Sequence, residues 1–116
     1  MFMGLIIFRL WHHNVIYSYA GKEMIMIFKQ RLEDYTEAEF LDFLRGFSIY
    51  PDGLHGKALE AYLDRLLTHF EKVTEHPGRS DVIFYPKEGQ EDSPEGILKE
   101  VKAWRATNNK PGFKPE

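Results

Sequence analysis

The chain has 116 residues, which is enough for one domain built around one hydrophobic core. It has no cysteine, which excludes disulfide bonds and thiolate metal sites, and its apolar content of 43% is typical of a soluble globular protein. The formal net charge of −3 argues against a nucleic-acid binder, which needs a basic face to neutralise phosphates, and suits a basic protein partner.

Residues 1–25 carry a net charge of +1, so the rest of the chain carries −3 minus +1, which is −4. Their apolar run is interrupted by polar residues and falls short of the roughly 20 apolar residues that span a membrane. As a signal peptide it lacks a positively charged start, although small residues lie near the expected cleavage position. A third interpretation, which we favour, is that translation starts at Met24 or Met26, because the codons of Lys22-Glu23 can resemble a bacterial ribosome-binding site. Residues 1–25 are then a leader or a disordered extension that packs poorly on a domain of residues 26–116.

The first predicted helix covers residues 37–47 and follows a short lead-in. Thr36 and Glu39 form a capping box, in which the Thr36 hydroxyl accepts from the Glu39 amide and the Glu39 carboxylate reaches back to Thr36. Apolar residues then recur at helical spacing as far as Phe47. The proline and the glycines of residues 48–56 predict a loop.

The second predicted helix covers residues 57–75. A buried stripe recurs along it at steps of three and four residues, formed by Leu59, Tyr62, Leu66, Phe70 and Val73. Leu63 and Leu67 widen this stripe on one side, and polar residues continue beyond them. The sequence His76-Pro77-Gly78 ends the helix.

Two adjacent aromatic residues, Phe84 and Tyr85, lie in the short segment 80–86. Ser80 is predicted to cap a single helical turn there. Both rings cannot point into one small core, so at least one is expected to face solvent, as on a surface that binds another protein. By the alternative interpretation, Phe84 fills the end of the bundle and Asp81 only caps the turn. Leu63 and Leu67 are then ordinary residues at the edge of the core.

The last predicted helix begins with Ser93 as N-cap and Pro94 at its first position. Its expected buried face consists of Ile97, Leu98, Val101 and Trp104. No convincing strand pattern is present, because residues 82–85 are too few and too isolated. The predicted fold class is therefore all-α, a small antiparallel four-helix bundle with a very short third helix.

The sequence does not predict a catalytic, metal or cofactor site. His69 and His76 lie seven residues apart, but no carboxylate at ligand spacing completes a site, and the run His12-His13-Asn14 lies in the proposed leader. Glu71 and Glu75 form a carboxylate pair of the kind found on a solvated helix face. No glycine-rich phosphate loop is present, and no serine has a plausible base near it. We therefore expect a protein that is not an enzyme and holds no cofactor.

Six motifs occur in consistent order along the later part of the chain. They are DYTEAEFL at 34–41, THFEKVTEHP at 68–77, SDVIFYP at 80–86, DSPEGI at 92–97, VKAWRA at 101–106 and KPGFK at 110–114. The set resembles the immunity proteins of DNase-type colicins and S-type pyocins. This resemblance implies a cytoplasmic protein of four helices, monomeric when free, that forms a 1:1 complex with the nuclease domain of one bacteriocin. It implies no contact with nucleic acid or membrane.

The resemblance also implies two binding surfaces. The first, which we call the anchor, is shared across the family and falls on Asp81, Phe84, Tyr85 and Pro86. The second, which we call the flank, discriminates between partners and falls on Leu63, Asp64, Leu67, Thr68, Glu71 and Lys72. Members of the family bind beside the nuclease active site and block DNA by bulk and negative charge.

Three features depart from the family pattern. Phe84 occupies a position where many relatives have tyrosine, Arg79 one where relatives usually have glycine, and the loop of residues 48–56 is longer than in close colicin relatives. These departures leave the cognate toxin open. The alternatives to immunity are a helical adaptor or regulator, for which no basic recognition helix is visible, and a small hydrolase.

Overall fold

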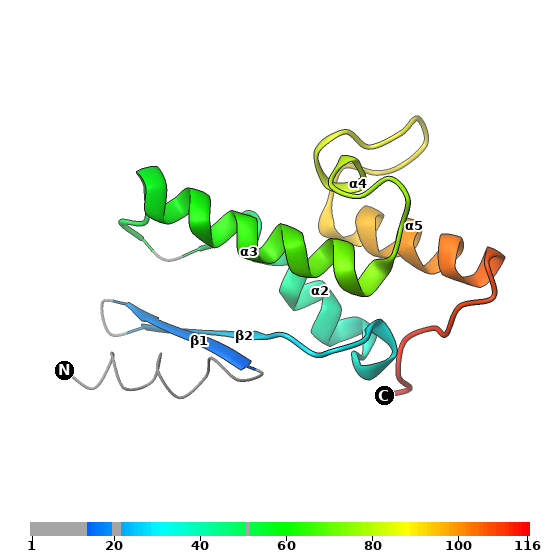
Figure 1. Cartoon of the computed structure of the whole chain (residues 1–116), viewed down its shortest axis with the longest axis horizontal. Helices are drawn as coiled ribbons and strands as arrows, with labels where there is room; N and C mark the ends of the chain where they lie inside the picture. The colour runs from blue at the N-terminus through cyan, green and yellow to red at the C-terminus, as the bar shows by residue number, and fades with distance from the viewer. Residues whose placement is uncertain (1–13, 20–21, 51) are drawn as a thin grey trace.

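A computed structural model describes residues 14–19, 22–50 and 52–116. Within these ranges the chain forms two strands, one short 3-10 helix and four α-helices (Figure 1). In chain order they are β1 (Asn14–Tyr19), β2 (Lys22–Ile27), η1 (Leu32–Asp34), α2 (Glu37–Arg45), α3 (Gly56–Thr74), α4 (Asp81–Phe84) and α5 (Pro94–Thr107). The predicted helical bundle with a very short third helix is confirmed, since α4 has only four residues.

The predicted helix starts are confirmed where capping chemistry identified them. The Thr36 hydroxyl accepts from the backbone N–H of Glu39 at 3.1 Å, and the Glu39 carboxylate accepts from that of Thr36 at 3.0 Å. The Ser93 hydroxyl accepts from the backbone N–H of Gly96 at 3.0 Å, and Pro94 is the first residue of α5. Each cap satisfies N–H groups that have no partner inside the helix.

The expectation that the chain has no strand is wrong for residues 14–27. Strands β1 and β2 pair antiparallel, with Asn14 opposite Ile27 and Tyr19 opposite Lys22. The segments VIY at 15–17 and MIM at 24–26 have suitable β-propensity, and only two residues separate the strands in sequence. Strand β2 crosses residue 26, where the leader interpretation places the domain boundary; that interpretation stays a prediction.

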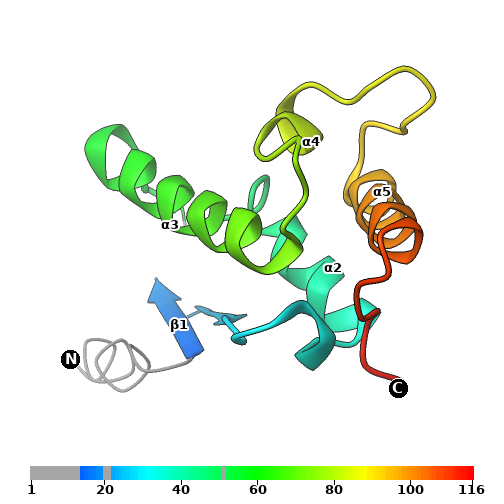
Figure 2. The ribbon, with the colours of Figure 1, turned by 45° about the vertical axis from the view of Figure 1, so that its right-hand side comes forward.

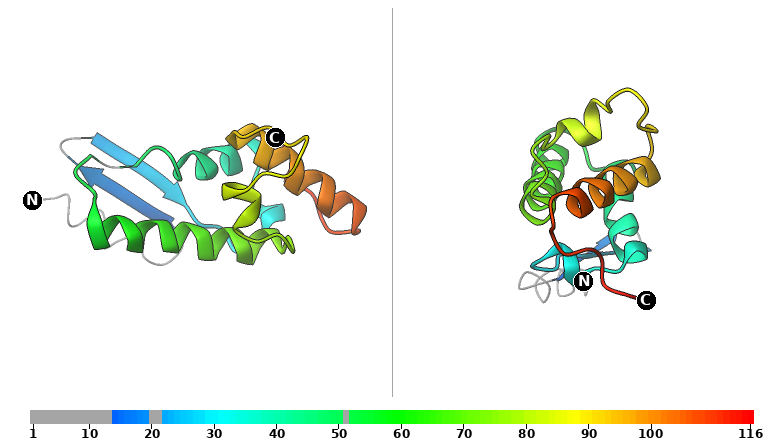
Figure 3. Two further views of the ribbon diagram at one scale, coloured as in Figure 1. Left: turned by 90° about the horizontal axis from the view of Figure 1, so that it is seen from above. Right: turned by 90° about the vertical axis from the view of Figure 1, so that its right-hand side faces the viewer.

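The core lies between α3 on one side and α2 with α5 on the other (Figure 3). It is rich in aromatic rings, and Tyr35, Phe40 and Phe70 are completely buried. The stripe predicted along α3 faces this core: four of its residues are buried, and Leu59 is partly buried against them. On α5, Ile97 is buried as predicted, whereas Trp104 is only half-buried.

Arg105 on α5 is the largest fully buried side chain among the described residues, and the sequence did not predict its burial. Its guanidinium donates to the last carbonyls of α3, Val73 at 3.3 Å and Thr74 at 3.1 Å, and to the carbonyl of Pro111 at 2.8 Å. These carbonyls have no partner inside their own helix or turn, so the fork-shaped guanidinium satisfies several acceptors at once. One side chain thereby joins α3, α5 and the C-terminal segment.

The C-terminal segment 108–116 returns along the side of the bundle to the start of α2 (Figure 2). The backbone N–H of Lys114 donates to the carbonyl of Tyr35 at 2.8 Å, and the Phe113 ring lies 5.5 Å from that of Phe40. This segment therefore covers the end of the core opposite the strands. No helix in the described part of the chain is long and apolar enough to cross a membrane.

Candidate binding surface

Helix α4 presents the anchor. Val82 and Ile83 face the core with exposed fractions of 5% and 9%, whereas Phe84 is 52% and Tyr85 is 76% exposed. A single turn that buries two consecutive apolar residues must direct the next two away from the core. The prediction that at least one ring faces solvent is confirmed, and both do. Phe84 does not fill the end of the bundle, although its ring meets Phe47 edge-on at 6.4 Å.

The predicted cap of α4 by Ser80 is wrong. Ser80 itself has helical backbone angles, and its side chain makes no capping hydrogen bond. The short helix is held instead by Gln90, whose side-chain N–H donates to the carbonyl of Val82 at 2.9 Å. Sequence reasoning missed Gln90, because only the fold of the acidic loop brings it back to a residue eight positions earlier.

His76 fixes the turn that leads from α3 to α4. Its Nδ1 accepts from the backbone N–H of Gly78 at 2.9 Å, so its proton sits on Nε2 and is donated to the Glu100 carboxylate, also at 2.9 Å. Lys87 pairs with the other oxygen of Glu100 at 3.0 Å. Partial burial acts to raise the pKa of Glu100, but the hydrogen bonds from His76 and Lys87 outweigh it and hold that pKa below its usual value. The anchor therefore sits between two segments that are both tied to α5.

The flank lies along the solvent side of α3. Leu63 and Leu67 are half-buried and pack against the core, and Glu71 is half-buried near the end of the helix. The remaining members, Asp64, Thr68 and Lys72, are exposed. The spacing of three and four residues places them on one helix face, as the sequence predicted.

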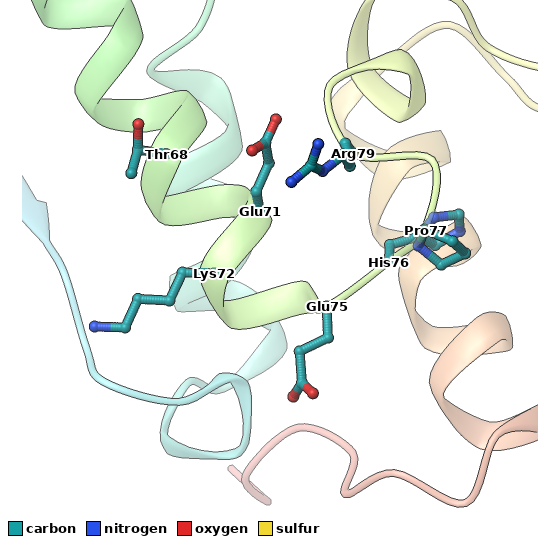
Figure 4. A pocket seen from close by; sticks show the side chains of 7 residues that line it. All are labelled: Thr68, Glu71, Lys72, Glu75, His76, Pro77 and Arg79. Atoms are coloured by element: carbon teal, nitrogen blue, oxygen red, sulfur yellow. The ribbon is translucent and has the colours of Figure 1, made fainter.

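A groove connects the flank with the chain that leads to the anchor (Figure 4). It is lined by Thr68, Glu71, Lys72, Glu75, His76, Pro77 and Arg79. Three of these residues belong to the flank, and Arg79 lies two residues before the anchor begins at Asp81. The structure thus connects the flank on α3 with the segment that leads into the anchor.

Arg79 has an unusual backbone conformation for its type. Its φ of 53° lies in the left-handed region, which costs a non-glycine residue about 1–2 kcal/mol relative to the right-handed conformation. The backbone N–H of Arg79 donates to the carbonyl of His76 at 3.1 Å, and its carbonyl accepts from Val82 at 3.2 Å, so the turn itself requires this geometry. The turn expected for glycine is retained, and the arginine adopts it at a cost.

His69 lies beneath the flank in an aromatic cluster. The Tyr35 hydroxyl accepts from the backbone N–H of Lys29 at 3.0 Å and is hydrogen-bonded to His69 Nε2 at 2.8 Å, and the Phe28 ring stacks on the imidazole at 4.6 Å between centroids. Burial lowers the pKa of His69 to about 4 and raises that of Tyr35 to about 12. His69 is therefore neutral at pH 7.

The two histidines considered for a metal site have different partners, Tyr35 for His69 and Glu100 for His76. No cluster of three or more potential ligands occurs among the residues that the structure describes. His12 and His13 lie outside those residues.

The chain is similar in sequence to proteins of one known family. The profile of the family described as "Colicin immunity protein / pyocin immunity protein" matches residues 32–107. The chain is 44% identical to the Pyocin-S2 immunity protein of Pseudomonas aeruginosa over 86 residues, which cover 74% of this chain and 97% of the relative. The Pyocin-S1 immunity protein of the same species is similar to the same extent.

Two solved structures share the fold. A chain of the crystal structure of the pyocin AP41 DNase–immunity complex superposes with a TM-score of 0.70, at 53% identity over 76% of this chain and all of that one. A chain of the complex between the mutant nuclease domain of pyocin S8 and its cognate immunity protein gives a TM-score of 0.57, at 39% identity over 75% of this chain and all of that one.

Proposed function

Because this chain belongs to the family of colicin and pyocin immunity proteins, we propose that it binds and inhibits the DNase domain of one bacteriocin and so protects the cell that makes the toxin. The observation that carries the proposal is the exposed pair Phe84 and Tyr85 on a short helix that is tied to its neighbours on both sides. The similar pyocin AP41 and S8 structures are complexes of a nuclease domain with an immunity protein. We place the protein in the cytoplasm, where it forms a 1:1 complex.

The anchor supplies most of the binding energy. Tyr85 exposes 76% of its surface on a backbone that is already fixed, so binding buries a large ring at a small cost in conformational entropy. Phe84 adds apolar contact without a hydroxyl, and its edge contact with Phe47 orients the ring before the partner arrives. Asp81 lies three and four positions before the two rings, a spacing that favours one helix face, so its carboxylate can pair with a basic residue of the nuclease.

The flank supplies discrimination. Three of its six members are exposed and three are half-buried, and they differ in charge, with Asp64 and Glu71 acidic and Lys72 basic. A nuclease that fails to match these charges would leave at least one of them buried without a partner, which is costly. Inhibition then follows from position and charge: an acidic protein bound beside the active site obstructs DNA and repels its phosphates.

The direct test is binding and inhibition by the purified protein. We expect it to bind the DNase domain encoded beside its own gene and to abolish cleavage of plasmid DNA by that domain at a 1:1 ratio. Tyr85→Ala should weaken binding by about 2–4 kcal/mol, which is the usual range for a central aromatic residue. Isothermal titration calorimetry, or displacement of a labelled wild-type protein where binding is too tight, measures this loss.

The matched control is Ile49→Ala, which removes another exposed apolar side chain from the loop between α2 and α3, outside the anchor and the flank. It should change affinity by less than about 0.5 kcal/mol, the usual effect of a substitution away from such features. Equal affinity of Tyr85→Ala and wild type would refute the anchor. Absence of any binding by the wild type would refute the immunity function itself. Cleavage of DNA by the purified protein alone would favour a hydrolase instead.

A further inference from the structure

The groove between α3 and the turn before α4 is lined by two cations, two carboxylates and a histidine, on a molecule that is acidic as a whole. Of its charged groups, Glu75 pairs with Lys110 at 2.9 Å, and His76 is bonded to Glu100. The side chains of Glu71, Lys72 and Arg79 make no ion pair or hydrogen bond within the described part of the chain. Two cations and one carboxylate are therefore left to meet a partner.

Arg79 is a cation of this groove that is costly to keep, although Glu75 shares its left-handed backbone. Its backbone is held in the left-handed region, and its side chain is exposed on the surface that lies next to the anchor. Figure 4 shows its guanidinium turned across the groove toward the carboxylate of Glu71. A free cation here also opposes a basic partner, since a DNase domain must carry positive charge to hold DNA. The backbone strain of Arg79 and its repulsion by a basic partner are both offset if the partner supplies an acidic group at this point.

We propose that Arg79 is a specificity-determining residue that pairs with a carboxylate on the surface of the cognate nuclease domain. The guanidinium offers several N–H donors in a planar fork, which matches the two oxygens of a carboxylate. Acidic groups are scarce on a DNA-binding surface, so a requirement for one at a fixed place discriminates between otherwise similar basic domains. This inference rests on the proposed function and names one chemical feature of the partner.

A charge series at one position tests the pairing. Arg79→Lys keeps the charge, Arg79→Asn removes it with a residue that tolerates the left-handed conformation, and Arg79→Glu reverses it. For the DNase domain encoded beside the gene, we expect affinity to fall in the order arginine, lysine, asparagine, glutamate. The loss should be about tenfold for asparagine and larger for glutamate, on the scale on which about 1.4 kcal/mol is one factor of ten. Thermal unfolding of each variant checks that the domain stays folded.

Lys99→Gln is the matched control, because it removes one exposed positive charge from α5, outside the anchor and the flank. Its affinity should stay within about twofold of wild type. If affinity is unchanged along the Arg79 series, or rises as the charge becomes negative, the pairing is overturned. In both cases the wild type still binds, so the immunity function survives. A wild type that does not bind the domain at all refutes both.

Specificity is tested separately, by comparing the affinities of the same variants for other nuclease domains. The series is also measured against the nuclease domains of pyocin AP41 and pyocin S8. A loss confined to the cognate domain supports a specific carboxylate. An equal loss with all three domains overturns the specificity role, because it shows that Arg79 acts through a feature common to these nucleases.

Discussion

The stacked and hydrogen-bonded imidazole of His69 makes the stability of this domain depend on pH. Its pKa in the folded protein is about 4, below the ordinary value of 6.5, so the unfolded chain binds a proton that the folded chain does not. The stability contributed by the neutral imidazole is complete above pH 6.5 and is lost as pH falls from 6.5 toward 4. The charged imidazole would have to leave its place between Phe28 and the Tyr35 hydroxyl.

We therefore expect the free energy of unfolding in urea to fall by about 1–2 kcal/mol between pH 7 and pH 5, after allowance for solvent screening of a partly exposed group. His69→Gln keeps an acceptor for the Tyr35 hydroxyl and does not titrate, so it should be less stable at pH 7 but have a flatter pH profile. His55→Gln, at an exposed histidine, is the control and should keep the wild-type slope. A His69→Gln profile as steep as that of wild type would rule out this imidazole as the cause.

Whether a single side chain is buried or exposed was predictable where local geometry decided it. The exposure of at least one of Phe84 and Tyr85 followed from the length of their segment, and the structure confirms it, with both rings exposed. The burial of Arg105 was not predictable, because an arginine on an amphipathic helix is ordinarily solvated and only the meeting of α3 with the C-terminal segment provides its acceptors.

Helix α3 has one face in the core and one face toward solvent. Tyr62, Leu66 and Phe70 are buried in the core, while Asp64 and Thr68 remain exposed. Because Asp64 and Thr68 lie outside the core, their substitution should alter recognition, as we propose, without unfolding the domain.

An exchange of the exposed positions tests this separation. Asp64, Thr68 and Glu71 are replaced together by the residues that the Pyocin-S2 immunity protein carries at the matching positions. We expect the ratio of affinities for the cognate and the pyocin S2 nuclease domains to shift by at least about tenfold toward pyocin S2. The melting temperature should change little. A change in melting temperature with an unchanged affinity ratio would assign these residues to stability alone.

The charge of the whole molecule bears on the speed of association. The formal net charge is −3, and a nuclease domain that binds DNA is basic, so long-range attraction should accelerate their encounter. Arg79 and Lys72 modify this field locally but do not reverse it.

Stopped-flow measurements over a range of salt concentrations test this attraction. We expect the association rate constant to fall by about tenfold or more between low salt and 0.5 M sodium chloride, because the Debye length shrinks to a few ångströms. The dissociation rate constant should change much less, since the apolar contacts that we propose for Phe84 and Tyr85 are not screened by salt. An association rate that does not depend on salt would contradict electrostatic steering.

The sequence by itself determined the helices, the caps of α2 and α5 and the exposure of at least one ring of the aromatic pair. These features depend on residues three or four positions apart, as in the capping box of Thr36 and Glu39, and such contacts form whenever the helix forms. The family resemblance added the positions of the anchor and the flank, whose roles await the binding measurements.

Only the tertiary structure decided how these parts meet. The bond between Tyr35 and His69 joins residues 34 positions apart, and the groove that connects the flank to Arg79 exists because α3 ends where the turn fixed by His76 begins. The pairing of β1 with β2 was likewise overlooked in a segment interpreted as a leader. Such contacts depend on the packing of whole elements against one another, and no local pattern of residues specifies that packing.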